Sequence, residues 1–139
     1  MKIILLSGDK HCGKTTTLTM VYDTLTKGMN QKPNVNCIKP KKDFHCSFTY
    51  KKKNKEVAIV TFGDVLYLFI EMIIFYCTVD YLIIAFSKGG IIKSKVLNFF
   101  RKCKQHTCFD KTVSKIGTTK AIKDKANLID CNKIINAIK

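Results

Sequence analysis

Acidic residues and arginine are scarce in this sequence. Ten aspartates and glutamates stand against 25 lysines and arginines, which gives a formal net charge of +15. Arg101 is the only arginine, so nearly all of the positive charge comes from lysine. A charge of this size favours polyanionic partners such as nucleic acid or phosphorylated ligands. An AT-rich genome would also supply many lysines, so the charge alone does not select a function.

The sequence also lacks the patterns of a secreted, disulfide-bonded or zinc-binding protein. Its seven cysteines are odd in number and irregularly spaced, and none forms the C-x-x-C pair of a structural zinc site. The apolar run at residues 3–6, after Met1 and Lys2, is too short for a secretory segment. We therefore expect reduced thiols and a cytoplasmic location.

General disorder and a membrane span are both disfavoured. Hydrophobic residues make up 46% of the 139 residues, enough for a buried core in one domain. Residues 65–86 are apolar over a length that could cross a bilayer. Glu71 lies near the middle of this run and Asp80 interrupts it, and both are costly in lipid. We therefore expect two buried elements of an α/β core and no membrane span.

Apolar runs of strand length and helix length follow one another along the chain and predict an α/β fold. Strands are expected at 3–6, 44–50, 57–62, 80–86 and 107–111. Helices are expected at 14–25, 65–77, 91–101 and 127–138. The lysine-rich residues 51–55 are typical of a hairpin connection, and residues 29–43 of a surface loop. This order predicts a mostly parallel sheet of about five strands with one antiparallel hairpin strand and helices on both faces.

One segment carries a recognisable chemical pattern, G-x-x-x-x-G-K-[ST], between the first expected strand and helix. Its residues are Gly8, Asp9, Lys10, His11, Cys12, Gly13, Lys14 and Thr15, followed by Thr16. Glycines at the two fixed positions let the backbone turn tightly and approach a phosphate. Successive N–H groups then converge on the anion at the positive end of the helix. Lys14 can reach the β- and γ-phosphates, and the Thr15 hydroxyl can coordinate Mg²⁺.

Over residues 1–27 the sequence resembles the P-loop NTPase superfamily. The resemblance implies a three-layer P-loop fold, a nucleotide cradle at 8–16 and a second acid on a neighbouring strand that helps to hold Mg²⁺. We expect this acid to be Asp64, which follows the strand at 57–62 and lies at the carboxyl edge of the sheet. The alternative role for Asp64 is to cap the helix at 65–77, and one residue could do both. Asp80 precedes its strand and is expected at the opposite edge.

The sequence carries no complete motif of one subgroup of the P-loop NTPase superfamily. The hairpin between the first helix and the Asp64 strand is similar to the kinase–GTPase division. A complete N-K-x-D guanine motif is absent, and residues 109–112 are the best candidate beside the base. A single arginine argues against an adenylate-kinase-like enzyme, which clamps phosphate with several. The lysine that follows the first glycine in ParA/MinD-type ATPases is replaced by Asp9.

We expect residues 1–139 to form a single minimal domain that binds a nucleoside triphosphate with Mg²⁺ and hydrolyses it, with ATP favoured over GTP. No general base is evident, because Glu56 and Glu71 lie inside predicted elements. Completion of the site by a protein partner or a second copy of the chain would explain this. Two alternatives remain open: a small-molecule or nucleotide kinase whose acceptor binds at 29–43, and a non-enzymatic, nucleotide-regulated module that binds nucleic acid or protein.

Overall fold

The fold of this chain is known from a computed structural model. It describes residues 1–38, 43–63, 65–88, 94, 95, 98, 100, 106–112 and 119–138. The strands are β1 (Lys2–Gly8), β2 (Asn36–Ile38), β3 (Asp43–Tyr50), β4 (Lys55–Val60), β5 (Tyr81–Ser87) and β6 (His106–Asp110). The helices with assigned bounds are α1 (Lys14–Leu25), α2 (Leu66–Phe75) and α4 (Lys120–Ala137). The chain is therefore an α/β protein, as the sequence predicts.

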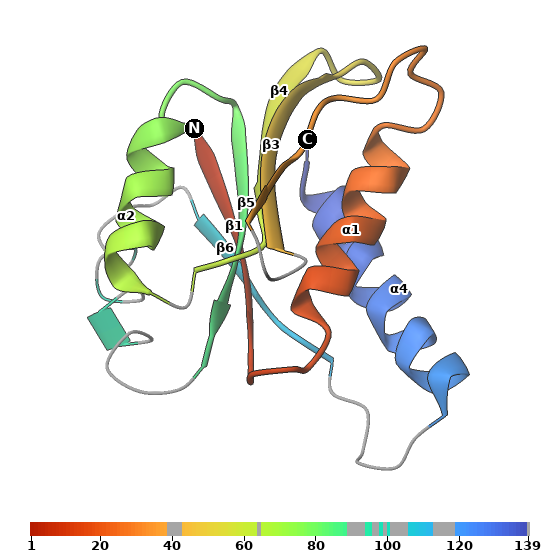
Figure 1. The fold of residues 1–139 in the computed structure, drawn as a ribbon, viewed down its shortest axis with the longest axis vertical. Helices are drawn as coiled ribbons and strands as arrows, with labels where there is room; N and C mark the ends of the chain where they lie inside the picture. The colour runs from red at the N-terminus through yellow and green to blue at the C-terminus, as the bar shows by residue number, and fades with distance from the viewer. Residues whose placement is uncertain are drawn as a thin grey trace.

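The strands form one six-stranded mixed sheet in the order β2-β3-β4-β5-β1-β6 (Figure 1). The four strands β4, β5, β1 and β6 are parallel, whereas β3 is antiparallel to β4 and β2 is antiparallel to β3. All five predicted strands are present. The expectation of a loop throughout 29–43 is wrong, because β2 lies within it and pairs with β3. The sheet consequently has six strands and two antiparallel pairings, rather than about five strands and one hairpin strand.

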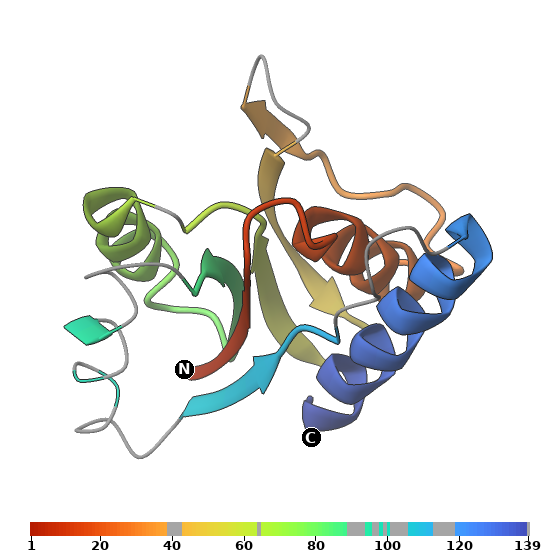
Figure 2. The same ribbon diagram turned by 90° about the horizontal axis from the view of Figure 1, so that it is seen from below.

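Helices cover both faces of the sheet (Figure 2). Helices α1 and α4 lie side by side on one face, and α2 lies on the other. Alternate residues of β1 serve the two sides: Ile4 and Leu6 pack in the core beneath α1 and α4, whereas Ile3 and Leu5 pack in the core beneath α2. A strand that is buried on both faces needs apolar residues at every position. This explains why the patterns of β1 and β5 are continuous rather than alternating.

The predicted helices agree with the structure to different extents. The bounds of α1 match the prediction, and α2 lies within the predicted 65–77. Helix α4 begins at Lys120 rather than at residue 127. The prediction missed this start because the first two turns are exposed and carry no apolar periodicity. The predicted helix at 91–101 falls mostly outside the described residues.

The apolar run at 65–86 is divided between two elements. Helix α2 ends at Phe75, and β5 begins at Tyr81. Within the described residues, no helix is both long enough and apolar enough to cross a bilayer.

The sheet topology sorts the acidic residues between its two edges. Asp80 lies before β5, where its carboxylate accepts a hydrogen bond from the Glu56 N–H at 3.0 Å and pairs with Lys55 at 3.8 Å. This is the edge at which the parallel strands begin, as predicted for Asp80. Because β3 is antiparallel, its first residue, Asp43, lies at the other edge, where β1, β4 and β5 end. The residues between β1 and α1 lie at that same edge.

The interface between α1, α4 and the sheet yields a stability prediction. Ile134 of α4 is fully buried in this core, whereas Ile129 of the same helix is 43% exposed. Ile134→Ala should lower the free energy of unfolding by about 2–5 kcal/mol, because it removes buried methyl groups and leaves a cavity. Ile129→Ala should change it by less than about 0.5 kcal/mol. Urea denaturation of both variants measures the difference, and equal losses would contradict this placement of α4.

Candidate functional site

The loop between β1 and α1 is shaped by two glycines with different roles. Gly13 has φ of +90°, a conformation that a side chain rarely allows, and His11 also has a positive φ of 61°. Gly8 is needed for space, since a Cβ there would lie 2.6 Å from the Cys12 Sγ and 2.8 Å from the Lys111 Cβ. Residues with positive φ in a turn direct neighbouring N–H groups inward, which favours anion binding. The loop therefore combines a turned backbone with tight packing against the chain after β6.

The Lys14 side chain is buried inside this loop. Its ammonium donates hydrogen bonds to the carbonyl oxygens of Gly8 at 3.1 Å and Asp9 at 2.8 Å, and to the Ser87 Oγ at 3.4 Å. The residue is only 8% exposed. Within the described part of the chain, no carboxylate forms an ion pair with it. A buried charge that is balanced only by dipoles is costly, and a bound anion would offset that cost.

The Thr15 hydroxyl lies beside a carboxylate that the sequence analysis missed. Thr15 Oγ1 donates a hydrogen bond to Asp43 Oδ1 at 2.9 Å. Thr61, which follows β4, lies 3.3 Å from the same carboxylate oxygen through its Oγ1 and accepts a hydrogen bond from the Phe44 N–H at 2.8 Å. The missed signal is the direction of β3: an antiparallel strand brings its first residue to the edge where the parallel strands end. Asp43 was instead assigned to the end of a surface loop.

The other predicted metal ligand, Asp64, lies outside the described residues, so the expected pairing of Thr15 with Asp64 stays a prediction. Its neighbour Gly63 packs so closely on the Ala85 carbonyl of β5 that a Cβ could not be accommodated. The resemblance implied an acid on a strand next to β1. Strands β5 and β6 lie next to β1, and Asp64 follows β4, which is one strand further away.

The remaining predicted loop residues lie toward solvent to different degrees. Cys12 is half-buried, whereas the other side chains are exposed, namely those of Asp9, Lys10, His11 and Thr16. The structure thus brings Lys14, Thr15 and the two loop glycines into one compact turn. Because most side chains of residues 9–13 face solvent, the groups that this turn presents to its interior belong to the backbone.

Helix α4 supports the loop from behind. The Thr17 hydroxyl of α1 donates a hydrogen bond to the Asn127 Oδ1 at 3.2 Å, and both residues are buried. A Cβ on Gly13 would lie 3.0 Å from the same Asn127 oxygen. The first turn of α1 and the end of the loop are therefore held against one polar side chain of α4.

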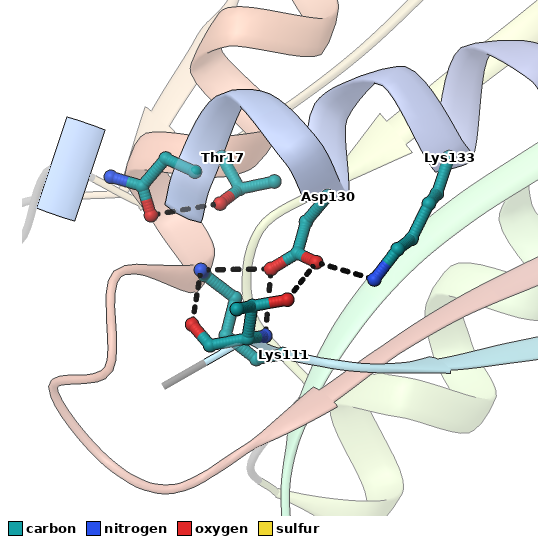
Figure 3. Close-up of polar contacts among 6 residues, drawn as sticks. Thr17, Lys111, Asp130 and Lys133 are labelled. Atoms are coloured by element: carbon teal, nitrogen blue, oxygen red, sulfur yellow. Dashed lines mark hydrogen bonds and ion pairs between the residues drawn. The ribbon is translucent and has the colours of Figure 1, made fainter. Parts of the chain in front are cut away.

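A buried ion pair joins the end of β6 to α4 (Figure 3). The Lys111 ammonium lies 2.9 Å from the Asp130 Oδ2, and both side chains are almost fully buried. Thr112 donates two further hydrogen bonds to this carboxylate, from its N–H at 2.8 Å and its hydroxyl at 2.7 Å. Lys133 approaches the other oxygen at 3.3 Å. Burial alone would raise the pKa of Asp130, but the hydrogen bonds from Thr112 and Lys111 outweigh it and hold this pKa below its ordinary value.

This network changes the interpretation of residues 109–112, the candidate segment beside a nucleotide base. Lys111 and Thr112 are committed to Asp130. Asp110 is 68% exposed through its side chain, accepts a hydrogen bond from the Ser7 hydroxyl and pairs with Lys88 at 3.0 Å. Asp110 is therefore the member of the segment that faces solvent at the loop edge.

Comparisons of this chain with protein-family models, with curated proteins and with solved structures found no match. Across the described ranges, no group of three or more His, Cys, Asp or Glu side chains is arranged to hold a metal ion. Any ion at this edge would therefore need hydroxyl oxygens, ligand oxygens or water to complete its coordination.

The buried ion pair predicts a large effect on stability. Asp130→Ala leaves the Lys111 ammonium buried without its carboxylate and should cost about 3–5 kcal/mol of unfolding free energy. Asp124→Ala, in the exposed part of the same helix, should cost less than about 0.5 kcal/mol. Urea denaturation at pH 7 measures both values. Similar small losses in the two variants would show that the ion pair does not stabilise α4 against β6.

The lowered pKa of Asp130 predicts a pH dependence with a definite sign. A carboxylate whose pKa is lower in the folded than in the unfolded state stabilises the protein above its unfolded pKa of about 3.9. That contribution is lost as the pH falls from this value through the folded pKa. The stability difference between wild type and Asp130→Asn should therefore be largest near neutral pH and shrink below about pH 4. Denaturation curves at a series of pH values test this, and a difference that grows with acid would contradict it.

Proposed function

We propose that this chain binds a nucleoside triphosphate, ATP or GTP, with Mg²⁺ in the loop of residues 8–16 of a three-layer P-loop fold, and hydrolyses it. The observation that carries the proposal is the Lys14 ammonium, which is buried in a turned glycine loop without a carboxylate partner among the described residues. A triphosphate supplies the missing negative charge. In sheets of this class, ligands bind where the parallel strands end, which is where the loop lies.

The residues of the loop have distinct roles in this proposal. The N–H groups of the turn and the first turn of α1 bind phosphate oxygens, and the positive end of α1 adds to their attraction. The Lys14 ammonium gives up its hydrogen bonds to the Gly8 and Asp9 carbonyls, binds phosphate oxygens instead and holds the phosphates in place. Mg²⁺, when bound, neutralises charge on the phosphates and thereby favours their cleavage. The Thr15 hydroxyl lies in the first turn of α1, where it can provide an oxygen to that ion.

The two glutamates do not lie at the loop, which supports slow turnover. Glu56 is near the start of β4 at the opposite edge, where it accepts a hydrogen bond from Thr49, and Glu71 is exposed on α2. A base that activates water must lie within hydrogen-bond reach of it. A protein partner or a second copy of the chain would then complete the site.

The same observation favours a second candidate function, a non-enzymatic module regulated by nucleotide. In this form the nucleotide stabilises one arrangement of the loop, and a nucleic acid or protein partner recognises it. The two candidates differ in phosphate release. Release by the wild-type chain, alone or with RNA or DNA, supports hydrolysis, whereas tight binding without release supports the module.

Replacement of Lys14 tests nucleotide binding directly. Lys14→Ala should weaken the binding of ATP or GTP by at least about 10-fold, since a charged hydrogen bond is worth about 1.5–3 kcal/mol. Lys27→Ala is the matched control, because this exposed lysine lies just beyond the far end of α1. Titration calorimetry with each nucleotide and Mg²⁺ measures the affinities. Unchanged affinity in Lys14→Ala would overturn the proposal.

A further inference from the structure

Three side chains from different elements meet beside the loop. They are Thr15 in the first turn of α1, Asp43 at the start of β3 and Thr61 after β4. Both hydroxyl oxygens lie within hydrogen-bond distance of one carboxylate oxygen, Asp43 Oδ1, at 2.9 Å from Thr15 and 3.3 Å from Thr61. The second oxygen, Asp43 Oδ2, takes no hydrogen bond or ion pair from any residue that the structure describes. Oδ1 is therefore held by two hydroxyls, and the described residues leave Oδ2 unoccupied.

The direction of the Thr15 hydrogen bond matters for its chemistry. A threonine hydroxyl has one proton and two lone pairs. Because the proton is donated to Asp43, the lone pairs of Thr15 Oγ1 are left for a cation. Hard divalent cations such as Mg²⁺ bind carboxylate, hydroxyl, phosphate and water oxygens. A carboxylate that also orients a ligand oxygen strengthens the binding of the ion.

We propose that Asp43 is the protein carboxylate of the Mg²⁺ site, acting with Thr15 and positioned by Thr61. This inference rests on the proposed function, since the triphosphate would provide further oxygens to the same ion. Asp43 binds the cation directly through Oδ2 or through a bound water. Thr61, which is 4% exposed, is a positioning residue. Its hydroxyl accepts a hydrogen bond from the Phe44 N–H, and its one proton is shared between the Phe44 carbonyl at 3.2 Å and Asp43 Oδ1 at 3.3 Å.

Other aspartates are less suited to this role. Asp130 is buried beneath Lys111, Asp110 is paired with Lys88, and Asp80 lies at the opposite edge. Among the residues that the structure describes, no lysine or arginine forms an ion pair with Asp43. Asp64 lies outside the described residues and is therefore the competitor that the experiment must test.

The experiment compares ATP binding with Mg²⁺ and with EDTA, by titration calorimetry on the full chain. We expect Mg²⁺ to tighten binding to the wild-type chain, and Asp43→Asn to lose about 10–100-fold of that enhancement. Binding in EDTA should be unchanged or tighter in Asp43→Asn, because a negative charge beside the phosphates is removed. A general disruption of the loop would weaken binding in both buffers. Asp23→Asn, an exposed aspartate of α1 paired with Lys32, is the matched control and should behave as wild type.

A second measurement reads the metal itself. Mn²⁺, titrated into the protein–nucleotide complex and followed by electron paramagnetic resonance, should bind about 10–100-fold more weakly to Asp43→Asn. Asn retains an oxygen that accepts the Thr15 and Thr61 hydrogen bonds, so the variant should keep the fold. If Asp43→Asn does not fold, Asp43→Ser provides a second variant that lacks the carboxylate. Thr61→Val should reduce Mn²⁺ affinity, and Thr61→Ser should restore it.

The outcomes separate this inference from the proposed function. If Asp43→Asn keeps the full Mg²⁺ enhancement, Asp43 is not the metal carboxylate. If Asp64→Asn loses the enhancement while Asp43→Asn retains it, the role belongs to Asp64 and the inference is overturned. If the wild-type chain binds no nucleotide in either buffer, the proposed function itself fails and the inference fails with it.

Discussion

The site depends on the hydrogen bonds that hold the buried Lys14 ammonium inside the loop. The ammonium lies where β1 and β5 end and reaches the carbonyls of Gly8 and Asp9 and the hydroxyl of Ser87. Enclosing a charge in this way requires rigid surroundings, because the dipoles that balance it must stay in place. The adjacent parallel strands and the turned loop provide that rigidity. The same geometry that makes the buried ammonium costly would make a bound anion favourable.

The surroundings of the loop extend this constraint to both sides. On one side, Asn127 of α4 contacts the loop at Gly13, while Lys111 packs on Gly8 and is anchored by Asp130. On the other side, Asp43 holds the first turn of α1 through Thr15. Elements far apart in the sequence therefore support one short turn. A change in the loop on ligand binding would be felt at α4 and at the start of β3, because both touch residues of the turn or of its helix.

The features that could be predicted are those that depend on residues close together in the sequence. The motif at 8–15, the strand before it and the bounds of α1 follow from local pattern, and the structure agrees on the strand and the helix. Strand β2 could not be predicted, since three residues paired only with β3 carry no periodicity. The exposed start of α4 was missed for a similar reason. Asp43 was missed although the predicted hairpin already brings the start of β3 to this edge, because residues 29–43 were interpreted as a loop and its contact with Thr15 spans 28 residues of sequence.

The scarcity of acidic residues gives Asp43 its significance. Four aspartates are neutralised in ion pairs, namely Asp23, Asp80, Asp110 and Asp130. In a chain of net charge +15, lysines attract a triphosphate whether or not a metal accompanies it. Positive charge alone would thus favour the metal-free nucleotide, since Mg²⁺ cancels part of the attraction. A carboxylate beside Thr15 would reverse that preference locally, because a negative charge repels bare phosphate and attracts a cation. If Asp43 binds the ion as proposed, the preference for the metal complex rests on a carboxylate beside Thr15, against the charge of the chain as a whole.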